Sequence, residues 1–246
     1  MTRDQVYGRR AVREALRGRR EVLELWATER AQKAEAWLRD VERPRVQIKL
    51  ERELSEAART RDHQGALAWC EPYKYADAWE LVSAAERPLL VCLDQVTDPH
   101  NLGAVCRSAE GAGADGLVVP AHGAATITPV VARASAGAIE HLRVGVVSNL
   151  ARYLAEVKSD RLWVYGAAGD AETTIWDADL SGGAAFVLGA EGRGLRPLVR
   201  RTCDALVSIP LQGRVESLNV SVAAGVLLYE AARQREPSRK LRFRDG

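Results

Sequence analysis

The chain has 246 residues, 47% hydrophobic and 28% charged, which is enough for two modest domains with apolar cores. No apolar run approaches the length of a membrane span, and the opening MTRDQVYGRR carries no apolar targeting segment. We therefore expect a cytoplasmic protein without a membrane partner. The four histidines and four scattered cysteines, with no C-x-x-C pair, argue against a metal site and favour buried, reduced thiols.

The net charge of +2 hides a strong asymmetry along the chain. Residues 1–62 and residues 233–246 each carry a net charge of +4, whereas the residues between them carry −6. Positive ends on an acidic centre favour a polyanionic partner such as nucleic acid. Arginine-rich helix faces that are merely solvated explain the same charge equally well.

Helix and strand patterns alternate through the first 70 or so residues. Apolar spacing of three and four predicts helices at 8–18, 30–41 and 51–60, and strands are expected at 21–28, 45–50 and 65–71. This alternation predicts a small α/β sandwich over residues 1–72. Prolines bracket the next stretch, so residues 73–87 are expected to form a linker with one short helix.

A second alternation fills residues 88–246. Strands are expected at 89–96, 116–120, 142–148, 161–168, 184–190 and 205–211, and helices at 101–113, 128–140, 150–160, 195–203 and from 220 onward. This order predicts a mostly parallel sheet with helices on both faces. A basic tail, expected to be mobile, follows from residue 235.

Three polar stretches follow predicted strands, at the sheet edge where open α/β folds bind their ligands. The first, DQVTDPHNLGAVCRSAEGAGADG, contains Asn101 and Arg107. Asn101 is expected to be the N-cap of the helix, and that is its only role in the plainer interpretation. Arg107 lies on a largely apolar helix, so we expect it to be buried and to need an anionic partner, unless it is a surface arginine.

The second stretch, FVLGAEGRGLRPLVRRTCD, crowds Gly189, Gly192 and Gly194 into a turn between strand and helix. Its G-x-x-G-x-G spacing differs from the dinucleotide fingerprint and from the P-loop, which disfavours NAD and ATP. These glycines allow a ligand to approach the backbone closely, or they only shape the turn. Glu191 is either a partner of the helix dipole or an acceptor for a ligand or a catalytic arginine.

The third stretch, LVSIPLQGRVESLNVSVAAG, ends a strand at Ile209-Pro210 and opens the last helix with Ser217-Leu218-Asn219. Ser217 is as well explained as the N-cap of that helix as by any other role. A cap does not account for Asn219 or for Glu216 beside it.

Together, DPHNLGAVCRSA, LGAEGRGL and IPLQGRVESLNVSVAAGVLLYEAARQR resemble the three signature motifs of the SpoU (TrmH-like) RNA ribose 2′-O-methyltransferases, in the SPOUT superfamily. This resemblance covers Leu89 to about Arg235. VYGRRAVREAL and HQGALAWCEPYKYAD further resemble the substrate-binding domain of the branch that methylates a guanosine of 23S rRNA. The resemblance implies an RNA substrate, most simply rRNA and alternatively tRNA.

The resemblance also implies a trefoil knot in the C-terminal domain, S-adenosylmethionine bound in that knot, and a site built at a homodimer interface. Matched motif by motif, the catalytic set is Asn101, Arg107, Glu191, Ser217 and Asn219. The implied cofactor contacts are Leu188, Gly189, Gly192, Ile209, Pro210, Leu211, Ser217, Leu218 and Asn219. One departure is Gly123, which stands where relatives usually carry an arginine thought to meet RNA.

From Asn101 onward, the three motifs contain no histidine or lysine that could act as a base. We therefore expect Arg107 to position the 2′-hydroxyl and an RNA phosphate, and leave open which group takes the proton. The N-terminal domain is expected to select the RNA. His63 and Gln64 either reach an unpaired base or hold a local turn. A non-catalytic ribosome-assembly factor and a nucleotide-dependent oxidoreductase are the competing classes.

Overall fold

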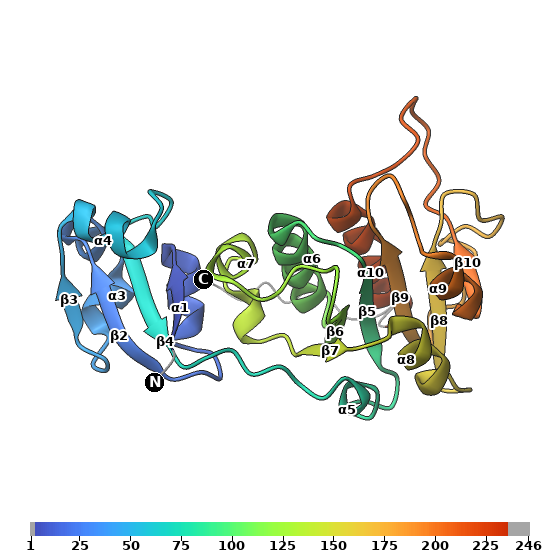
Figure 1. Cartoon of the computed structure of the whole chain (residues 1–246), viewed down its shortest axis with the longest axis horizontal. Coiled ribbons are helices and arrows are strands. Elements are labelled where there is room, and N and C mark those ends of the chain that lie inside the picture. Colours follow the sequence, from blue (N-terminus) through green and yellow to red (C-terminus); the bar gives the residue numbers. More distant parts are fainter. Residues whose placement is uncertain (1–2, 236–246) are drawn as a thin grey trace.

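The structure is a computed structural model that describes residues 3–235; the predicted basic tail lies outside this range after its first residue. Two α/β units lie along the longest axis of the molecule, joined by an extended segment (Figure 1). Within the described residues, no helix is long and apolar enough to cross a membrane.

The N-terminal unit is the predicted small sandwich. Its four strands are ordered β1-β4-β2-β3, with β4 antiparallel to both neighbours and β2 parallel to β3. The strands are β1 (Asp4–Tyr7), β2 (Val22–Ala27), β3 (Val46–Ile48) and β4 (Ala66–Cys70), and the helices are α1 (Arg9–Ala15), α2 (Glu29–Ala34), α3 (Ala36–Asp40) and α4 (Glu51–Ala58). The single helix predicted over 30–41 is wrong, because Glu35 adopts extended backbone and separates α2 from α3.

The segment between the sheets contains the predicted short helix, α5 (Ala78–Val82). This helix packs on the C-terminal unit. Ala78 and Leu81 are buried, and the hydroxyl of Tyr153 donates a hydrogen bond to the Ala78 carbonyl at 2.9 Å. Burial of these apolar side chains fixes the end of the linker against the second sheet.

The C-terminal unit is a six-stranded sheet in the order β10-β8-β9-β5-β6-β7, and every neighbouring pair is parallel. Its strands are β5 (Leu89–Asp94), β6 (Gly116–Pro120), β7 (Val144–Val147), β8 (Leu162–Ala167), β9 (Gly183–Gly189) and β10 (Ala205–Val207). Its helices are α6 (Pro99–Gly111), α7 (Pro129–Ala134), η1 (Ala138–Glu140), α8 (Leu150–Val157), α9 (Pro197–Thr202) and α10 (Val220–Arg235).

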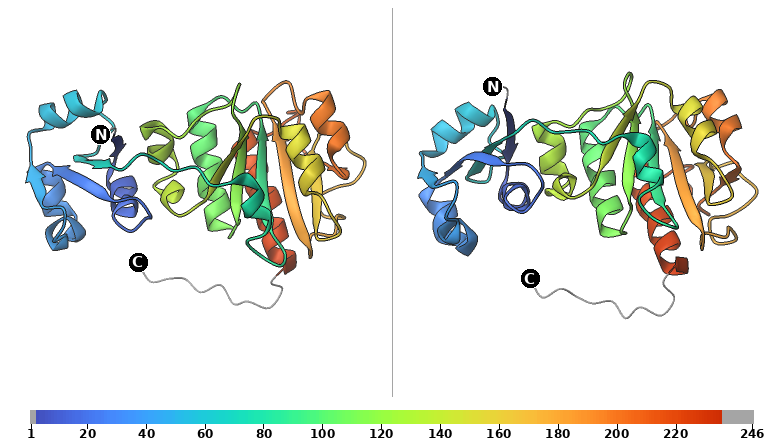
Figure 2. Two further views of the ribbon diagram at one scale, coloured as in Figure 1. Left: turned by 60° about the horizontal axis from the view of Figure 1, so that its bottom comes forward. Right: turned by 90° about the horizontal axis from the view of Figure 1, so that it is seen from below.

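Helices cover both faces of this sheet, as the sequence predicted (Figure 2). The strand β5 shows why: Leu89, Val91 and Leu93 face the core under α6 and α10, while Leu90 and Cys92 face the core under α8 and α9. The helix predicted over 128–140 is interrupted after α7, since Ala136 and Gly137 both take left-handed backbone. The fold class is confirmed, and the knot stays a prediction.

The two units are tied together by a buried ion pair. The Arg20 guanidinium binds the Glu140 carboxylate through Nη2–Oε1 and Nε–Oε2 contacts of 2.6 and 3.0 Å, and the Glu140 side chain is fully buried. His141 Nε2 lies 2.9 Å from a Glu14 oxygen at the same junction. Breaking a buried pair of this kind leaves an uncompensated charge, so the contact fastens the N-terminal unit to the turn after α7.

Candidate active site

The three polar stretches meet at one edge of the parallel sheet. Strands β5 and β9 are neighbours, with Asp94 opposite Gly189 in the register, so the segments that follow them leave the sheet side by side. Helix α10 packs against α6 and β9 and begins beside both segments. This is the edge at which parallel sheets collect functional groups.

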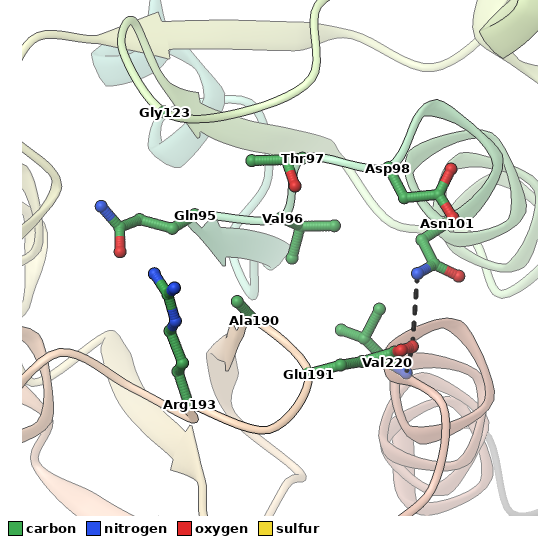
Figure 3. A pocket seen from close by; sticks show the side chains of 10 residues that line it. All are labelled: Gln95, Val96, Thr97, Asp98, Asn101, Gly123, Ala190, Glu191, Arg193 and Val220. Atoms are coloured by element: carbon green, nitrogen blue, oxygen red, sulfur yellow. Dashed lines mark hydrogen bonds between the residues drawn. The ribbon is translucent and has the colours of Figure 1, made fainter.

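Asn101, Glu191 and Asn219 form a hydrogen-bonded cluster at this edge (Figure 3 shows the first two). The Asn219 Nδ2 group donates to Glu191 Oε1 at 2.6 Å and to Asn101 Oδ1 at 3.0 Å. Asn101 Nδ2 donates to the same Glu191 oxygen at 3.2 Å. One residue from each motif is thus held by the other two, although the nearest pair is 28 residues apart in sequence.

The start of α10 fixes the orientation of this cluster. Asn219 Oδ1 accepts hydrogen bonds from the backbone N–H of Ser221 at 2.9 Å and from its hydroxyl at 2.6 Å, so Asn219 caps the helix. Its Nδ2 group must then face Glu191. The backbone N–H of Val220 also points at Glu191 Oε1, at 3.4 Å. The cap is therefore Asn219, and the interpretation of Ser217 as the N-cap is wrong.

The predicted N-cap of α6 is also wrong. Helix α6 begins at Pro99, and its cap is Asp98, whose carboxylate accepts from the backbone N–H of His100 at 2.8 Å. Proline is favoured at the first helical position, where its missing N–H costs nothing. Asn101 consequently lies in the first turn, and its amide is free to bind Glu191.

Arg107 is exposed, which contradicts the expectation of a buried arginine with an anionic partner. The buried side of α6 consists of Leu102, Gly103, Val105, Cys106 and Ala109. Arg107 lies on the opposite side, seven residues after the exposed His100. Six residues separate it from Asn101, which leaves the two side chains roughly 120° apart around the helix. Within one chain Arg107 faces the N-terminal unit and does not join the hydrogen-bonded cluster.

A hollow of about 470 Å³ opens on one side of Glu191, between the ends of β8, β9 and β10 and the start of α10. It is lined by eight of the nine residues expected to contact the cofactor, all but Pro210: Leu188, Gly189, Gly192, Ile209, Leu211, Ser217, Leu218 and Asn219. The apolar Ile209 and Leu218 share this lining with the polar Glu216 and Ser217. The structure brings these residues together, and their contact with a cofactor stays a prediction.

A second hollow, of about 490 Å³, opens on the other side of Glu191 (Figure 3). Ala190, Glu191 and Val220 line both hollows and so form the wall between them. The second hollow is also lined by Gly123, Gln95 and Arg193. That relatives carry an arginine at position 123 stays an expectation. Neither Gln95 nor Arg193 was singled out by the sequence, because no local pattern marks them.

The packing of the chain itself requires a glycine at position 189. A Cβ atom built on Gly189 would overlap the backbone of Gly194 and Leu195. The strand end and the following turn approach each other too closely for any side chain. A bulky substitution at Gly189 therefore disturbs the turn that carries Glu191, and it is not a specific probe of a bound ligand.

His63 is fully buried, which settles its two interpretations in favour of the turn. Its Nδ1 accepts from the backbone N–H of Gly65 at 3.0 Å, and its Nε2 lies 2.9 Å from the Ser55 hydroxyl. Gln64 is exposed, and its side-chain oxygen accepts from the backbone N–H of Arg9 at 3.2 Å.

No group of three or more histidine, cysteine or acidic side chains in residues 3–235 is placed to hold a metal ion. All four cysteines are free, and Cys70, Cys92 and Cys106 are buried. Burial raises the pKa of the Cys70 and Cys106 thiols to about 12, which keeps them protonated at neutral pH.

Two family models match the chain. Residues 88–229 match the SpoU rRNA Methylase family, and residues 5–76 match a model described as RNA 2′-O ribose methyltransferase substrate binding. The C-terminal match spans the parallel sheet and the Asn101, Glu191 and Asn219 cluster, and it covers more than half of the sequence. The chain belongs to the SpoU rRNA methylase family.

Individual relatives agree with this assignment. The chain is 48% identical over 181 residues to the 23S rRNA (guanosine-2′-O-)-methyltransferase RlmB of Pseudomonas putida, covering 72% of this chain and 73% of that protein. It is 41% identical over 193 residues to the Escherichia coli RlmB, covering 77% and 79%. Among solved structures, the SpoU methyltransferase AviRb of Streptomyces viridochromogenes in complex with AdoMet is 28% identical, with a TM-score of 0.80 over 95% of this chain and 91% of that one.

Proposed function

We propose that this chain transfers a methyl group from S-adenosylmethionine to the ribose 2′-hydroxyl of a guanosine in 23S rRNA. The observation that carries the proposal is the cluster of Asn101, Glu191 and Asn219 on a wall between two hollows. One hollow is available to the methyl donor and the other to the acceptor. The relatives from Pseudomonas putida and Escherichia coli support the reaction and the guanosine target by their names.

The first hollow fits S-adenosylmethionine by its chemistry. Ile209, Leu211 and Leu218 offer apolar surface to an adenine ring, whereas Glu216 and Ser217 offer polar groups to a ribose or an amino acid. The bound cofactor supplies a methyl group that is already activated on a sulfonium. The AviRb structure, solved with AdoMet and similar over nearly the whole chain, supports this assignment.

The task of the protein is then to align acceptor and donor, because the donor needs no further activation. Glu191 accepts three N–H groups, from Asn101, Asn219 and Val220, and is held at the border of the two hollows. We assign the side chains of Asn101, Glu191 and Asn219 to positioning the reacting groups. Ser217 is exposed in the first hollow and is assigned a contact with the cofactor.

Arg107 needs a second copy of the chain to complete the site. It keeps its assigned role of holding the 2′-hydroxyl and a neighbouring phosphate, but it does not reach the cluster within one chain. Helix α10 carries a partly exposed apolar stripe, Val222, Val226 and Tyr229, at spacings of four and three; Val222 is 52% and Tyr229 56% exposed, and Val226 is half-buried. A stripe of this kind beside the active cluster favours a homodimer built on α10.

The boundary between the two units is suited to RNA. Two adjoining hollows there are lined by Arg9, Arg10, Arg13, Arg17, Arg30, Arg107 and Arg133, against the acidic Glu14, Glu35, Glu51 and Glu110. No carboxylate within residues 3–235 pairs with Arg10, Arg13 or Arg107, and Arg13 Nε is buried without a hydrogen-bond partner. Unpaired arginines that converge on one cleft favour an RNA backbone as their partner.

The N-terminal unit is assigned the selection of the RNA. It contributes Arg9, Arg10, Arg13, Arg17 and Arg30 to the cleft and contains none of the three motifs. Its match to a model described as RNA 2′-O ribose methyltransferase substrate binding supports this role. The names of the two RlmB relatives favour rRNA over tRNA, the second candidate substrate.

The proposal is tested by incubating the full chain with methyl-tritiated S-adenosylmethionine and either a 23S rRNA fragment library or total tRNA. Nuclease digestion and mass spectrometry then identify the labelled nucleoside. We expect 2′-O-methylguanosine in one 23S fragment and no label in tRNA. Label in tRNA alone would overturn the target, and label on a base would overturn the reaction.

A further inference from the structure

The second hollow is lined by a set of residues that differs from the lining of the first. It shares with the first only the wall formed by Ala190, Glu191 and Val220 (Figure 3). If the first hollow holds the methyl donor, the second hollow adjoins it along this wall and offers space to a nucleotide that accepts the methyl group. The inference below therefore rests on the proposed function.

Gln95 is the strained residue of this hollow. It follows the last residue of β5 and has φ 62°, a left-handed conformation that glycine adopts freely and glutamine rarely. Its side chain is half-buried, and its amide has no hydrogen-bond partner within residues 3–235. Strained backbone that presents an unsatisfied polar group into a pocket is typical of ligand contacts.

Gly123 lies beside the Gln95 amide. A Cβ atom built on Gly123 would lie 3.5 Å from Gln95 Nε2, and φ of 71° at Gly123 is again left-handed. A side chain at position 123 would be strained by this backbone, which glycine adopts freely.

Arg193 brings a positive charge to the same hollow. Its side chain extends from the turn after β9 toward Gln95 (Figure 3), and it is exposed, with no carboxylate paired to it among the described residues. The turn that carries Arg193 also carries Glu191, and Gly194 closes this turn by donating its N–H to the Ala190 carbonyl at 2.9 Å. The backbone that carries Arg193 is therefore joined to the wall between the hollows.

We propose that Gln95 and Arg193 form the binding site for the acceptor nucleotide of the RNA. The Gln95 amide carries a donor and an acceptor side by side and hydrogen-bonds the edge of the base. The Arg193 guanidinium binds a phosphate next to the methylated ribose. Both groups hold the substrate, and neither takes part in the transfer itself.

The most informative variant is Gln95→Gly, because glycine suits φ 62° and the fold is preserved. We expect KM for the methylated 23S fragment to rise on the order of tenfold, the effect of one lost hydrogen bond or two, with kcat nearly unchanged. The affinity for S-adenosylmethionine should match that of the wild type, and the melting temperature should not fall.

Arg193→Ala should raise the same KM on the order of tenfold and reduce the salt slope of RNA binding by about one. Arg201→Ala is the matched control, since Arg201 is an exposed arginine of α9 outside both hollows. Wild-type KM in Gln95→Gly, or equal effects of Arg193→Ala and Arg201→Ala, would overturn the assignment. A wild-type protein that methylates no 23S fragment would instead overturn the proposed function.

Discussion

Two polar regions of this molecule are built on opposite principles. At the edge of the parallel sheet, Asn101, Glu191 and Asn219 satisfy one another through direct hydrogen bonds. In the cleft between the units, Arg10, Arg13 and Arg107 are left without carboxylate partners among the described residues. A closed network holds reacting groups in place, whereas an open cluster of like charges is completed only by an anionic ligand. We therefore assign the chemistry to the sheet edge and the capture of RNA to the cleft.

The largest expected effect comes from opening the closed network at Asn219. Asn219→Ala removes both donors to Glu191 and Asn101 and also the cap of α10, so we expect transfer to fall on the order of 10²- to 10³-fold. It should also cost about 1 kcal/mol of stability. Asn219→Ser keeps an oxygen for the cap but has no amide for Glu191. Equal loss of transfer in both variants, measured as tritium incorporation, with a lower melting temperature only in Asn219→Ala, would separate the two roles of this residue.

Arg107 lies in the cleft between the units, but its assigned role is to hold the 2′-hydroxyl that receives the methyl group. Arg107→Ala should lower methyl transfer about a hundredfold while leaving the calorimetric affinity for S-adenosylmethionine unchanged, because it lines neither hollow beside Glu191. Arg107→Lys should restore little, since an ammonium lacks the planar fork of the guanidinium. Transfer at the wild-type rate by Arg107→Lys would contradict the positioning role.

A second copy is the proposed link between the two regions. Val222→Arg places a charge on the exposed stripe of α10, where burial against an identical helix would be costly. We expect a monomer by light scattering at micromolar concentration and transfer reduced at least tenfold, in line with the few kcal/mol that a buried unpaired charge costs. Leu198→Arg, at an exposed leucine of α9, is the control and should leave the dimer intact. A wild-type chain that is monomeric at that concentration would remove the dimer from the account.

The smallest effects are expected from single arginines of the open cluster. Arg10→Ala should weaken binding of the 23S fragment about five- to tenfold, with a shallower dependence on salt and no change in cofactor affinity. Arg45→Ala, an exposed arginine before β3 and outside the cleft, is the matched control. Filter binding over a range of salt concentrations distinguishes them. Equal slopes for both variants would mean that the cleft does not take the phosphates.

The sequence predicted that the three polar stretches lie at one sheet edge, but it did not predict the helix caps or the position of Arg107. All parallel strands end at the same edge of a sheet, so the predicted topology brings the three polar stretches to one edge. That β5 lies next to β9 and that α10 begins beside both is seen only in the structure, and this is what joins Asn101, Glu191 and Asn219. The cap of α6 could have been predicted from the sequence, since Asp98-Pro99 is a typical N-cap followed by proline at the first helical position. The six-residue spacing between Asn101 and Arg107 already places them on different sides of a helix.

Other features depend on tertiary structure and leave no local mark. The left-handed backbone of Gln95 is imposed by the way β5 leaves the sheet, and nothing in the sequence around it indicates the strain. The pairing of Arg20 with Glu140 and the convergence of Arg10 with Arg107 join residues about a hundred or more positions apart. Such contacts require the two units to be placed against each other.

The central claim is that methyl transfer takes place at the wall carried by Glu191. Glu191→Ala removes the acceptor of three N–H groups at once and leaves the rest of the cluster without its centre. The direct test is single-turnover transfer from tritiated S-adenosylmethionine to the 23S fragment, with both substrates saturating. The account predicts a loss on the order of 10²- to 10³-fold with RNA affinity unchanged. Transfer by Glu191→Ala at the wild-type rate would contradict it.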